Sequence, residues 1–325
     1  TKQSDMKMKM EDGSFAVSDK DNADIMGRHF KKVFNNHKPI DLSVLDELEQ
    51  KPILDELGFT PTEGEIRAAL RKIANGKSPG ESDITPEPLK GLDGYNFSIL
   101  SDFLTAYWSD PMIDYEDWHR NLLCALQKPG KGKDYSSPDS WRGICLAEIP
   151  AKIQSSIIST RLLNHLETVG IETQYRCVPG KGCADALFSI KTALQTRKQH
   201  GKDTWAAFID LVKAFDTADH ELLFLILKKY GVPETLVSVI AKMYKDAVVI
   251  LKVGEESREV PYKVGVKQGD NMAPVLFIYL MNAFAETLAK KWNFDKLGFN
   301  WFPEKLNGNK SGRLTGTRGN SSRII

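Results

Sequence analysis

The chain has 325 residues, of which 41% are hydrophobic and 27% charged, and its formal net charge is +1. This composition is typical of one large or two ordinary globular domains and excludes a uniformly basic nucleic-acid-binding tail, although not a local basic groove. No apolar run reaches the ~18 residues of a membrane span, and the N-terminus lacks a signal-peptide pattern. We therefore expect an intracellular protein, nuclear or cytoplasmic, that is neither secreted nor bound to a membrane.

In the first half of the chain, helical patterns surround one pair of short strands. Apolar residues recur at helical spacing over 24–34 and 95–108, and Thr62 with Glu65 has the spacing of a capping box that starts a helix. Short apolar runs at 122–126 and 141–146 flank a basic, Gly-rich turn, which predicts two strands joined as a hairpin. A long helical pattern follows over 149–169.

In the second half, a helix is expected over 183–199, and the apolar run WAAFIDL (205–211) is typical of a buried strand with one acid near its end. Further helices are expected over 219–230, 233–243 and 272–291, and a strand pair over 248–253 and 259–264. Because helices stand before and after each strand group, the pattern predicts an α+β fold with a small antiparallel sheet rather than a regular βαβ array.

Three segments could carry chemistry. Asp210 lies near the end of the apolar run, where a buried carboxylate is costly unless it is paired or binds a metal such as Mg²⁺. The alternative is an aspartate that caps the next helix. The segment VGVKQGDN (264–271) has two glycines that permit close backbone approach to a ligand, and is otherwise an ordinary strand–turn–helix junction. The basic turn, with Lys128 and Arg142 at its ends, could hold phosphate or be a solvated charged turn.

Other phosphate and metal motifs are incomplete. The sequence GKS at 76–78 resembles the end of a P-loop, but Arg71 stands where the first glycine is required. The four cysteines include no C-x-x-C pair, and the six histidines show no metal spacing. These patterns give no support to a P-loop NTPase, a zinc site or a disulfide framework.

Five segments, taken in order, resemble motifs of the reverse transcriptase domain of non-long-terminal-repeat (LINE-type) retrotransposons. FIDLVKAFD (208–216) resembles F-x-D-x-x-x-A-F-D, and GVKQGDNMAPVLF (265–277) resembles G-x-x-Q-G-D-x-x-S-P-x-L-F. Three upstream elements are NGKSPGESDI (75–84), WRGICL (141–146) and QYRCVPGKGCADAL (174–187), the last two with Gly143 and Cys177 where the family has Pro and Phe. The similarity covers about residues 60–290.

The resemblance implies a polymerase right hand in which this chain supplies the fingers and part of the palm. Asp210 matches the first metal-binding aspartate of a two-ion Mg²⁺ (or Mn²⁺) site, with the Leu211 carbonyl as a further ligand. Phe215 matches the aromatic gate that packs under the sugar of the incoming deoxynucleoside triphosphate and excludes a 2′-hydroxyl. Arg142 and Lys128 match the basic finger residues beside the triphosphate.

Further matches lie along the RNA template and the DNA primer. Gln268 is implied to contact the nucleotide and the nascent base pair, and Gly269 the template beside it. Lys267, Gly80 and Lys152 are the other expected template or primer contacts. In this chemistry two metal ions activate the primer 3′-hydroxyl and stabilise the leaving pyrophosphate, while template contacts go mainly to the backbone.

The chain departs from the family pattern after residue 285. Residues 286–325 contain no Asp-Asp pair, so the aromatic-x-Asp-Asp motif that supplies the remaining metal carboxylates is not found. We therefore expect the thumb to be absent, the two-ion site to be incomplete and the isolated chain to polymerise poorly. A palm without this strand pair is also expected to leave an unpaired edge and exposed apolar surface.

The expected organisation is an N-terminal extension with a helix (1–60), a fingers-like region (61–200), a partial palm (201–291) and a disordered tail (292–325). The expected function is that of a fragment of a retrotransposon RNA-directed DNA polymerase. Two alternatives stay open: a degenerate protein that binds RNA or primer–template without catalysis, and a relative of group II intron maturases. The sequence predicts no oligomeric state.

Overall fold

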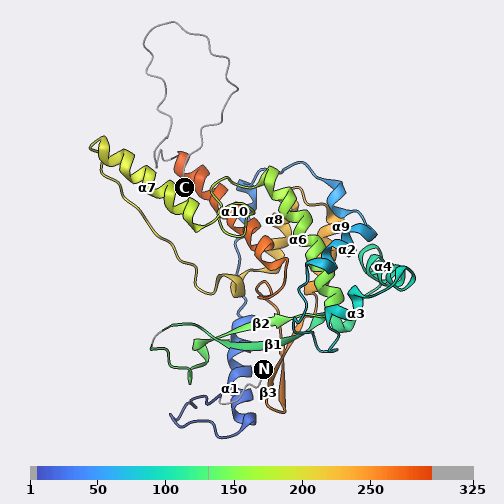
Figure 1. Cartoon of the computed structure of the whole chain (residues 1–325). Helices are drawn as coiled ribbons and strands as arrows, with labels where there is room; N and C mark the ends of the chain where they lie inside the picture. Colours follow the sequence, from blue (N-terminus) through green and yellow to red (C-terminus); the bar gives the residue numbers. More distant parts are fainter. Residues whose placement is uncertain (1–5, 131, 295–325) are drawn as a thin grey trace.

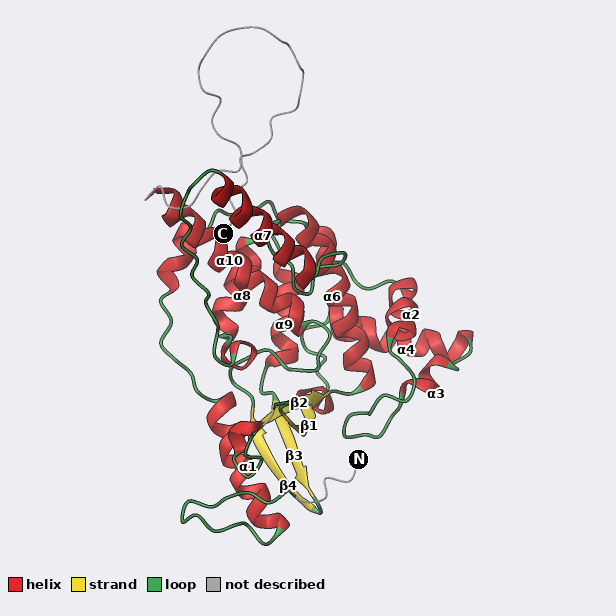
Figure 2. Cartoon of the chain, turned by 60° about the vertical axis from the view of Figure 1, so that its left-hand side comes forward, coloured by secondary structure: helices red, strands yellow, loops and turns green. Residues whose placement is uncertain are grey.

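A computed structural model of the chain describes residues 6–130 and 132–294. A four-stranded sheet lies at one end of the molecule, and most of the helices are stacked beyond it (Figure 1; Figure 2). The α+β architecture expected from the sequence is confirmed. From residue 295 onward, the tail expected over 292–325 lies outside the described residues.

The sheet has the order β2-β1-β3-β4, from β1 (Arg120–Gln127), β2 (Trp141–Leu146), β3 (Val248–Val253) and β4 (Glu256–Pro261). Both expected hairpins form as antiparallel pairs, whereas the central pair, β1 with β3, is parallel. The sheet is therefore mixed rather than purely antiparallel. A parallel pair needs a long crossover connection, and the helices between β2 and β3 provide it.

The helices account for most of the remaining described chain. They are α1 (Asp19–Phe34), η1 (Leu42–Glu47), η2 (Asp55–Gly58), α2 (Glu63–Lys72), α3 (Pro86–Lys90), α4 (Gly94–Ser109), α5 (Glu116–His119), η3 (Pro138–Ser140), α6 (Ile149–Val169), α7 (Cys183–Gln199), η4 (Ala214–Thr217), α8 (His220–Lys229), α9 (Glu234–Tyr244) and α10 (Ala273–Phe294). No helix within these described residues combines the length and the apolarity that crossing a bilayer requires.

Local sequence signals account for several helix ends. The predicted capping box of α2 is present: Thr62 Oγ1 accepts from the Glu65 amide at 3.2 Å, and the Glu65 carboxylate accepts from the Thr62 amide at 2.9 Å. Asp219 caps α8 by accepting from the Leu222 amide at 3.0 Å. These capping bonds satisfy amides at the helix starts that have no partner inside the helix.

The N-terminal helix α1 covers the sheet, packing on β3 and β4 (Figure 2). It also reaches the family-motif strand β2, because a Cβ at Gly143 would lie 3.0 Å from Cε1 of Phe30 and 2.6 Å from Cδ1 of Leu123. A larger residue at 143 would overlap these two side chains. The absence of a side chain at position 143 therefore lets Phe30 of α1 and Leu123 of β1 pack over β2.

The strand expected over 205–211 is wrong. The chain between α7 and η4 forms no strand within the described residues, and the side chains of Trp205 and Phe208 are 96% and 87% exposed. A strand is stable only when a neighbour takes its backbone hydrogen bonds, and none of the described strands pairs with this segment. The apolar run predicts strand propensity correctly, but no described partner is there to pair with it.

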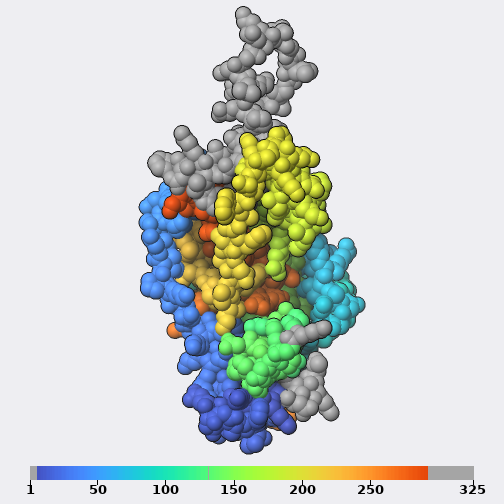
Figure 3. Space-filling view, turned by 90° about the vertical axis from the view of Figure 1, so that its left-hand side faces the viewer, coloured from blue at the N-terminus to red at the C-terminus, as the bar shows by residue number. Residues whose placement is uncertain are grey.

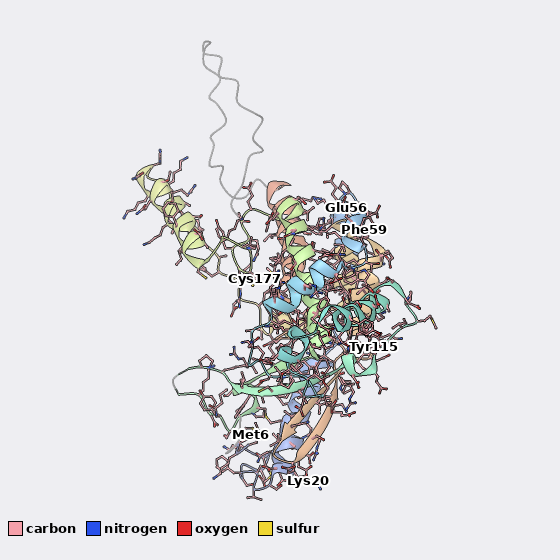
Figure 4. All side chains as sticks on the ribbon, turned by 45° about the vertical axis from the view of Figure 1, so that its right-hand side comes forward. Met6, Lys20, Glu56, Phe59, Tyr115 and Cys177 are labelled. Carbon is pink, nitrogen blue, oxygen red and sulfur yellow. The ribbon has the colours of Figure 1, made fainter. Side chains whose placement is uncertain are left out.

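The preceding helix α7 shares this exposure. It stands apart from the helical body, and side chains project from it on all sides (Figure 1; Figure 4). Apolar side chains on it face solvent, among them Leu187 at 62% and Phe188 at 72% exposure. Cys177 lies in the loop that leads from the body to this helix (Figure 4). The described residues therefore expose apolar surface on α7 and over 205–212, neither of which is part of the sheet.

Candidate nucleotide and template site

Two motif segments that are about 50 residues apart in the sequence lie side by side. The Val266 amide donates to the Phe215 carbonyl, and the Gly265 amide donates to the Ala218 carbonyl, both at 2.7 Å. Gly265 has φ +95°, and a Cβ there would lie 2.9 Å from the Phe215 carbonyl oxygen. Only glycine combines this backbone conformation with this close approach, so the junction depends on the glycine of the motif.

A side-chain hydrogen bond completes the junction. Nε2 of Gln268 donates to Oδ1 of Asp216 at 2.8 Å. Burial raises the pKa of Asp216, and this hydrogen bond together with the nearby Lys213 and Lys128 partly offsets that shift. Asp216 therefore orients the amide of Gln268.

The same loop is attached to strand β2. The Cys145 amide donates to the Gln268 carbonyl at 2.6 Å. Gly269 has φ +104°, and a Cβ on it would lie 2.7 Å from the Cys145 carbonyl oxygen. Because it has no side chain and φ is positive, Gly269 lets this loop lie directly against the backbone of β2.

A cavity of about 280 Å³ opens between the joined segments. It is lined by Arg176, Lys213, Ala214, Phe215, Asp216, Gln268, Gly269, Asp270, Ala273 and Pro274. The ring of Phe215 stacks on Phe277 of α10 with centroids 4.8 Å apart, which fixes the orientation of the aromatic wall. Asp270 hydrogen-bonds Ser155 and the N-terminus of α10, so its carboxylate is used within the protein.

A second, larger groove of about 610 Å³ begins on the other side of Gly269. Its charged lining residues are Lys72, Lys77 and Lys152, and it contains no acidic residue. Four hydroxyl residues also line it: Ser78, Ser156, Ser159 and Thr160. Lysines with hydroxyls, and no carboxylate, form a surface suited to the phosphates of a nucleic-acid backbone.

The loop that borders this groove, residues 75–82, is fastened to the start of α6. Glu148 accepts from the Ser82 amide at 2.9 Å, and Lys152 Nζ donates to the Ser78 carbonyl at 3.1 Å. Gly80 is buried against Glu148, whose carboxylate occupies the space that a Cβ would need. Gly80 therefore allows the loop to pack closely against Glu148. Burial lowers the pKa of Lys152.

The opposite wall, α2, is clamped to α6 by an ion pair. Arg161 donates from Nε to Glu65 Oε1 at 2.8 Å and from its terminal nitrogen to Oε2 at 2.9 Å. This two-bond geometry fixes the relative position of the two helices. Lys72 donates across the same interface to Thr160 Oγ1 at 3.1 Å, which places its ammonium group in the groove.

The candidate metal ligands are not gathered into a site. Asp210 and Leu211 lie on the exposed segment between α7 and η4. Among the described residues no group of three or more His, Cys, Asp or Glu side chains could hold a metal ion. The described residues therefore do not form a complete two-ion site, and we derive no catalytic step through a metal.

The remaining predicted residues are divided between surface and interior. Arg142 is exposed on β2, where its main chain pairs with Leu126 of β1, and its side chain makes no hydrogen bond or ion pair with any described residue. Lys128, at the end of β1, donates from Nζ to the Asp139 carbonyl at 2.7 Å. Lys267 is 4% exposed, donates to the Met243 carbonyl at 2.9 Å and reaches neither cavity. Its ammonium group holds the loop from inside, and burial lowers its pKa.

Four basic residues of the two cavities were missed by the sequence reasoning: Arg176, Lys213, Lys72 and Lys77. Arg176, Lys213 and Lys77 lie inside the recognised motifs QYRC, LVKAF and NGKSP. Their position within these motifs could have identified them as candidate site residues. Lys72 is the last residue of α2, and only the fold brings it to the groove.

Residues 126–303 match the family model described as reverse transcriptase (RNA-dependent DNA polymerase). The match covers more than half of the chain, and the chain therefore belongs to the reverse transcriptase family.

Three similar proteins place the chain among retrotransposon polymerases. It is 25% identical over 267 residues to the Retrovirus-related Pol polyprotein from type-2 retrotransposable element R2DM of Drosophila melanogaster, covering 82% of this chain and 24% of that protein. It is 27% identical over 286 residues to the Transposon TX1 uncharacterized 149 kDa protein of Xenopus laevis (81% and 20%). It is 25% identical over 285 residues to the Probable RNA-directed DNA polymerase from transposon BS of Drosophila melanogaster (82% and 30%).

These similarities confirm the resemblance to non-long-terminal-repeat retrotransposon reverse transcriptases. The helices and small sheet agree with the fingers and partial palm of that family. Reverse transcriptases use divalent metal ions and act on nucleic acid and deoxynucleoside triphosphates. The chain spans about a fifth to a third of the length of the three relatives.

Proposed function

We propose that this chain is the fingers and partial palm of an RNA-directed DNA polymerase, in which the 280 Å³ cavity takes the incoming nucleotide and the lysine-lined groove takes the template. One observation carries the proposal. Phe215 and Gln268, from separate motifs, line one cavity, and Gly269 lines both this cavity and the groove. A polymerase needs this adjacency, because the incoming base must meet the template base.

In this proposal the nucleotide cavity works by shape and charge. Phe215, held by its stack on Phe277, packs under the sugar and leaves no room for a 2′-hydroxyl. Gln268, oriented by Asp216, contacts the base pair that forms. Arg142 and Lys128 on the β1–β2 hairpin approach the triphosphate, and the free guanidinium of Arg142 can bind it without giving up a described partner.

The template would run along the groove between α2 and α6. Lys77 and Lys152 lie where they can neutralise phosphates, and the hydroxyl residues can donate to phosphate oxygens without reading sequence. Contacts of this kind suit an enzyme that copies any template. We place the division between fingers-like region (61–200) and palm (201–291) in the same proposal, although one sheet joins strands of both ranges.

Asp210 and the Leu211 carbonyl are proposed as the ligands that this chain gives to a Mg²⁺ (or Mn²⁺) site. When bound, the ions would activate the primer hydroxyl and stabilise the pyrophosphate. Since the described residues supply only part of the ligand set, the isolated chain is expected to bind primer–template but to extend it inefficiently. As the enzyme of a retrotransposon it would act inside the cell, in the nucleus or cytoplasm.

A second candidate is a protein that binds RNA or primer–template without catalysis. The exposed position of Asp210, with no described cluster of metal-ligating side chains, favours it. A primer-extension assay in Mg²⁺ or Mn²⁺ separates the two candidates, because only the polymerase elongates the primer. The effect of an Asp210→Asn substitution on any extension observed then tests the role of that carboxylate.

The template groove is tested by binding of a fluorescent RNA–DNA duplex with an RNA overhang. Lys72→Gln together with Lys77→Gln is expected to weaken binding roughly tenfold and to lower the salt dependence, since two phosphate contacts are lost. The matched control is Lys252→Gln, an exposed lysine on β3 that lines neither cavity. Equal affinity and salt slope for the double variant and the control would contradict the proposed groove.

A further inference from the structure

Asp139, which precedes β2 in the β1–β2 hairpin, attracts basic groups from three separate parts of the chain. Its Oδ1 lies 3.5 Å from Nζ of Lys213 and 3.9 Å from Nδ1 of His29 on α1. Its main-chain carbonyl accepts from Nζ of Lys128 at 2.7 Å. In Figure 3 the yellow segment that descends from α7 comes down to the green hairpin, directly above the blue N-terminal region. One residue therefore connects all three segments.

This cluster adjoins the proposed nucleotide cavity. Lys213 itself lines the cavity, next to Phe215 and Asp216. Lys128 is close enough to interact electrostatically with both Lys213 and Asp216. The Asp139 carboxylate therefore lies at the side of the cavity that carries the positive charges of Lys213 and Lys128. Negative charge on a ligand would be neutralised at this side.

The basic groups of the cluster repel one another. Burial, and next the charge of Lys213, lowers the pKa of Lys128. Burial, and next Lys213, also lowers the pKa of His29, with Lys128 and Lys32 adding to the shift and Asp139 opposing it. Within this group, the side chain of Asp139 is 76% exposed. An ion pair so exposed is weak, so a multiply charged anion can replace it.

We propose that Asp139 is a tethered counter-ion of the nucleotide cavity. Its carboxylate keeps Lys213 at the side of the cavity while no nucleotide is bound, and the triphosphate displaces it by pairing with Lys213 and Lys128. Asp139 is thus a positioning residue that also lowers the affinity for polyphosphate. The inference rests on the proposed function, because it assumes that the cavity takes a triphosphate.

The decisive variant is Asp139→Asn. It removes the negative charge and leaves the main-chain carbonyl that binds Lys128 in place. Removing one negative charge a few ångströms from a highly charged anion is expected to tighten binding roughly threefold. A variant that merely misfolded would bind less, so tighter binding is a readout that structural damage does not produce. Asp139→Glu, which keeps the charge, should restore the weaker affinity.

The matched control is Asp134→Asn in the same hairpin. Asp134 accepts from the Ser136 amide at 2.9 Å and from its hydroxyl at 2.6 Å, and forms no ion pair with a basic group of the cluster. It is also exposed, as Asp139 is. Any general effect of removing a carboxylate from the hairpin would therefore show in this variant too.

The experiment is calorimetric titration of the full chain and its variants with inorganic tripolyphosphate, repeated with dTTP. Tighter binding by Asp139→Asn, unchanged binding by Asp134→Asn and loss of the gain on adding Lys213→Gln would support the inference. Equal or weaker binding by Asp139→Asn would overturn it while leaving the nucleotide cavity in place. No binding by any variant would overturn both the cavity and the inference, whereas the template groove would still stand on its own test.

Discussion

Two neighbouring stretches of one motif have opposite environments. Residues 214–220 are held to the 265–270 loop by backbone hydrogen bonds, whereas residues 203–212 face solvent and form no strand within the described chain. The exposed stretch is the more apolar of the two. A hydrophobic run thus becomes a buried strand only where another segment can take its backbone hydrogen bonds.

The boundary between the two stretches is sharp. Lys213 has φ +51°, a left-handed conformation that is uncommon outside glycine, and it directly precedes η4. Its side chain pairs with Asp139 and lines the proposed nucleotide cavity. The chain therefore changes direction at the residue through which the hairpin and the cavity are connected.

The largest loss of stability is expected from a substitution at Gly265, where residues 214–220 are joined to the 265–270 loop. Gly265→Ala places a Cβ 2.9 Å from the Phe215 carbonyl at φ +95°. We expect the free energy of unfolding to fall by about 3 kcal/mol. Urea denaturation measures the change, with Gly94→Ala as control, since a Cβ at Gly94 meets nothing within 4 Å. Equal stability of the two variants would show that the junction tolerates a side chain.

A smaller loss is expected at the side-chain bond of the same junction. Gln268→Ala leaves the half-buried carboxylate of Asp216 without its amide donor and should cost about 1–2 kcal/mol. Adding Asp216→Asn should recover part of this loss, because an uncharged amide is less costly to leave unpaired. A double-mutant cycle gives the coupling energy, and strictly additive losses would argue against the bond.

The free energy of unfolding should also fall in mild acid, because largely buried histidines lie at the junction with the 265–270 loop and in the helical core. Burial lowers the pKa of His220, whose Nε2 bonds the Gly265 carbonyl at 2.7 Å, below its ordinary 6.5, and burial lowers the pKa of His165 likewise. The unfolded chain then binds more protons than the folded chain below pH 6.5. Stability is thus fully present above that pH and is lost as the pH falls.

Denaturation midpoints at pH 7.5, 6.5 and 6.0 measure this slope. His220→Gln keeps a side-chain donor but does not titrate, so it should flatten the slope relative to the unaltered chain. His200→Gln, an exposed histidine on the turn after α7, is the control and should leave the slope unchanged. A slope that is the same in all three chains would remove His220 as its cause.

The smallest change in stability is expected from substitutions in the exposed stretch, residues 203–212. Trp205→Glu and Phe208→Glu replace side chains that are 96% and 87% exposed, so the free energy of unfolding should change by less than about 0.5 kcal/mol. The same substitutions should reduce self-association, measured by sedimentation, because they remove exposed apolar surface. A loss above about 1 kcal/mol would mean that this stretch is packed in solution.

Signals between residues close in sequence were enough to predict most of the helices and both hairpins. The capping box at Thr62 and Glu65, the hairpin of β1 and β2 and the length of α6 were all predictable, because each depends on neighbours close in sequence. The parallel pairing of β1 with β3 was not, since it joins strands that are more than 100 residues apart. The strand expected over 205–211 failed for a related reason: propensity does not reveal whether a partner exists.

The candidate site was predictable in its parts rather than in its arrangement. The motif pattern identified Phe215 and Gln268, and the structure places both at one cavity. It could not reveal that Lys267 points inward, because the burial of a lysine depends on what packs over it. Asp139 lies outside every recognised motif, and only the fold brings it to Lys213 and His29.

The glycine at position 143 has a consequence for how the chain can be divided. Since Phe30 occupies the space over Gly143, the four-stranded sheet and the helix α1 that precedes the family motifs are complementary surfaces. A shortened protein that begins after residue 40 would expose the apolar face of β3 and β4 together with this vacancy. The N-terminal helix and the motif-bearing sheet are therefore one unit, and the boundary suggested by the motifs does not mark where the protein can be cut.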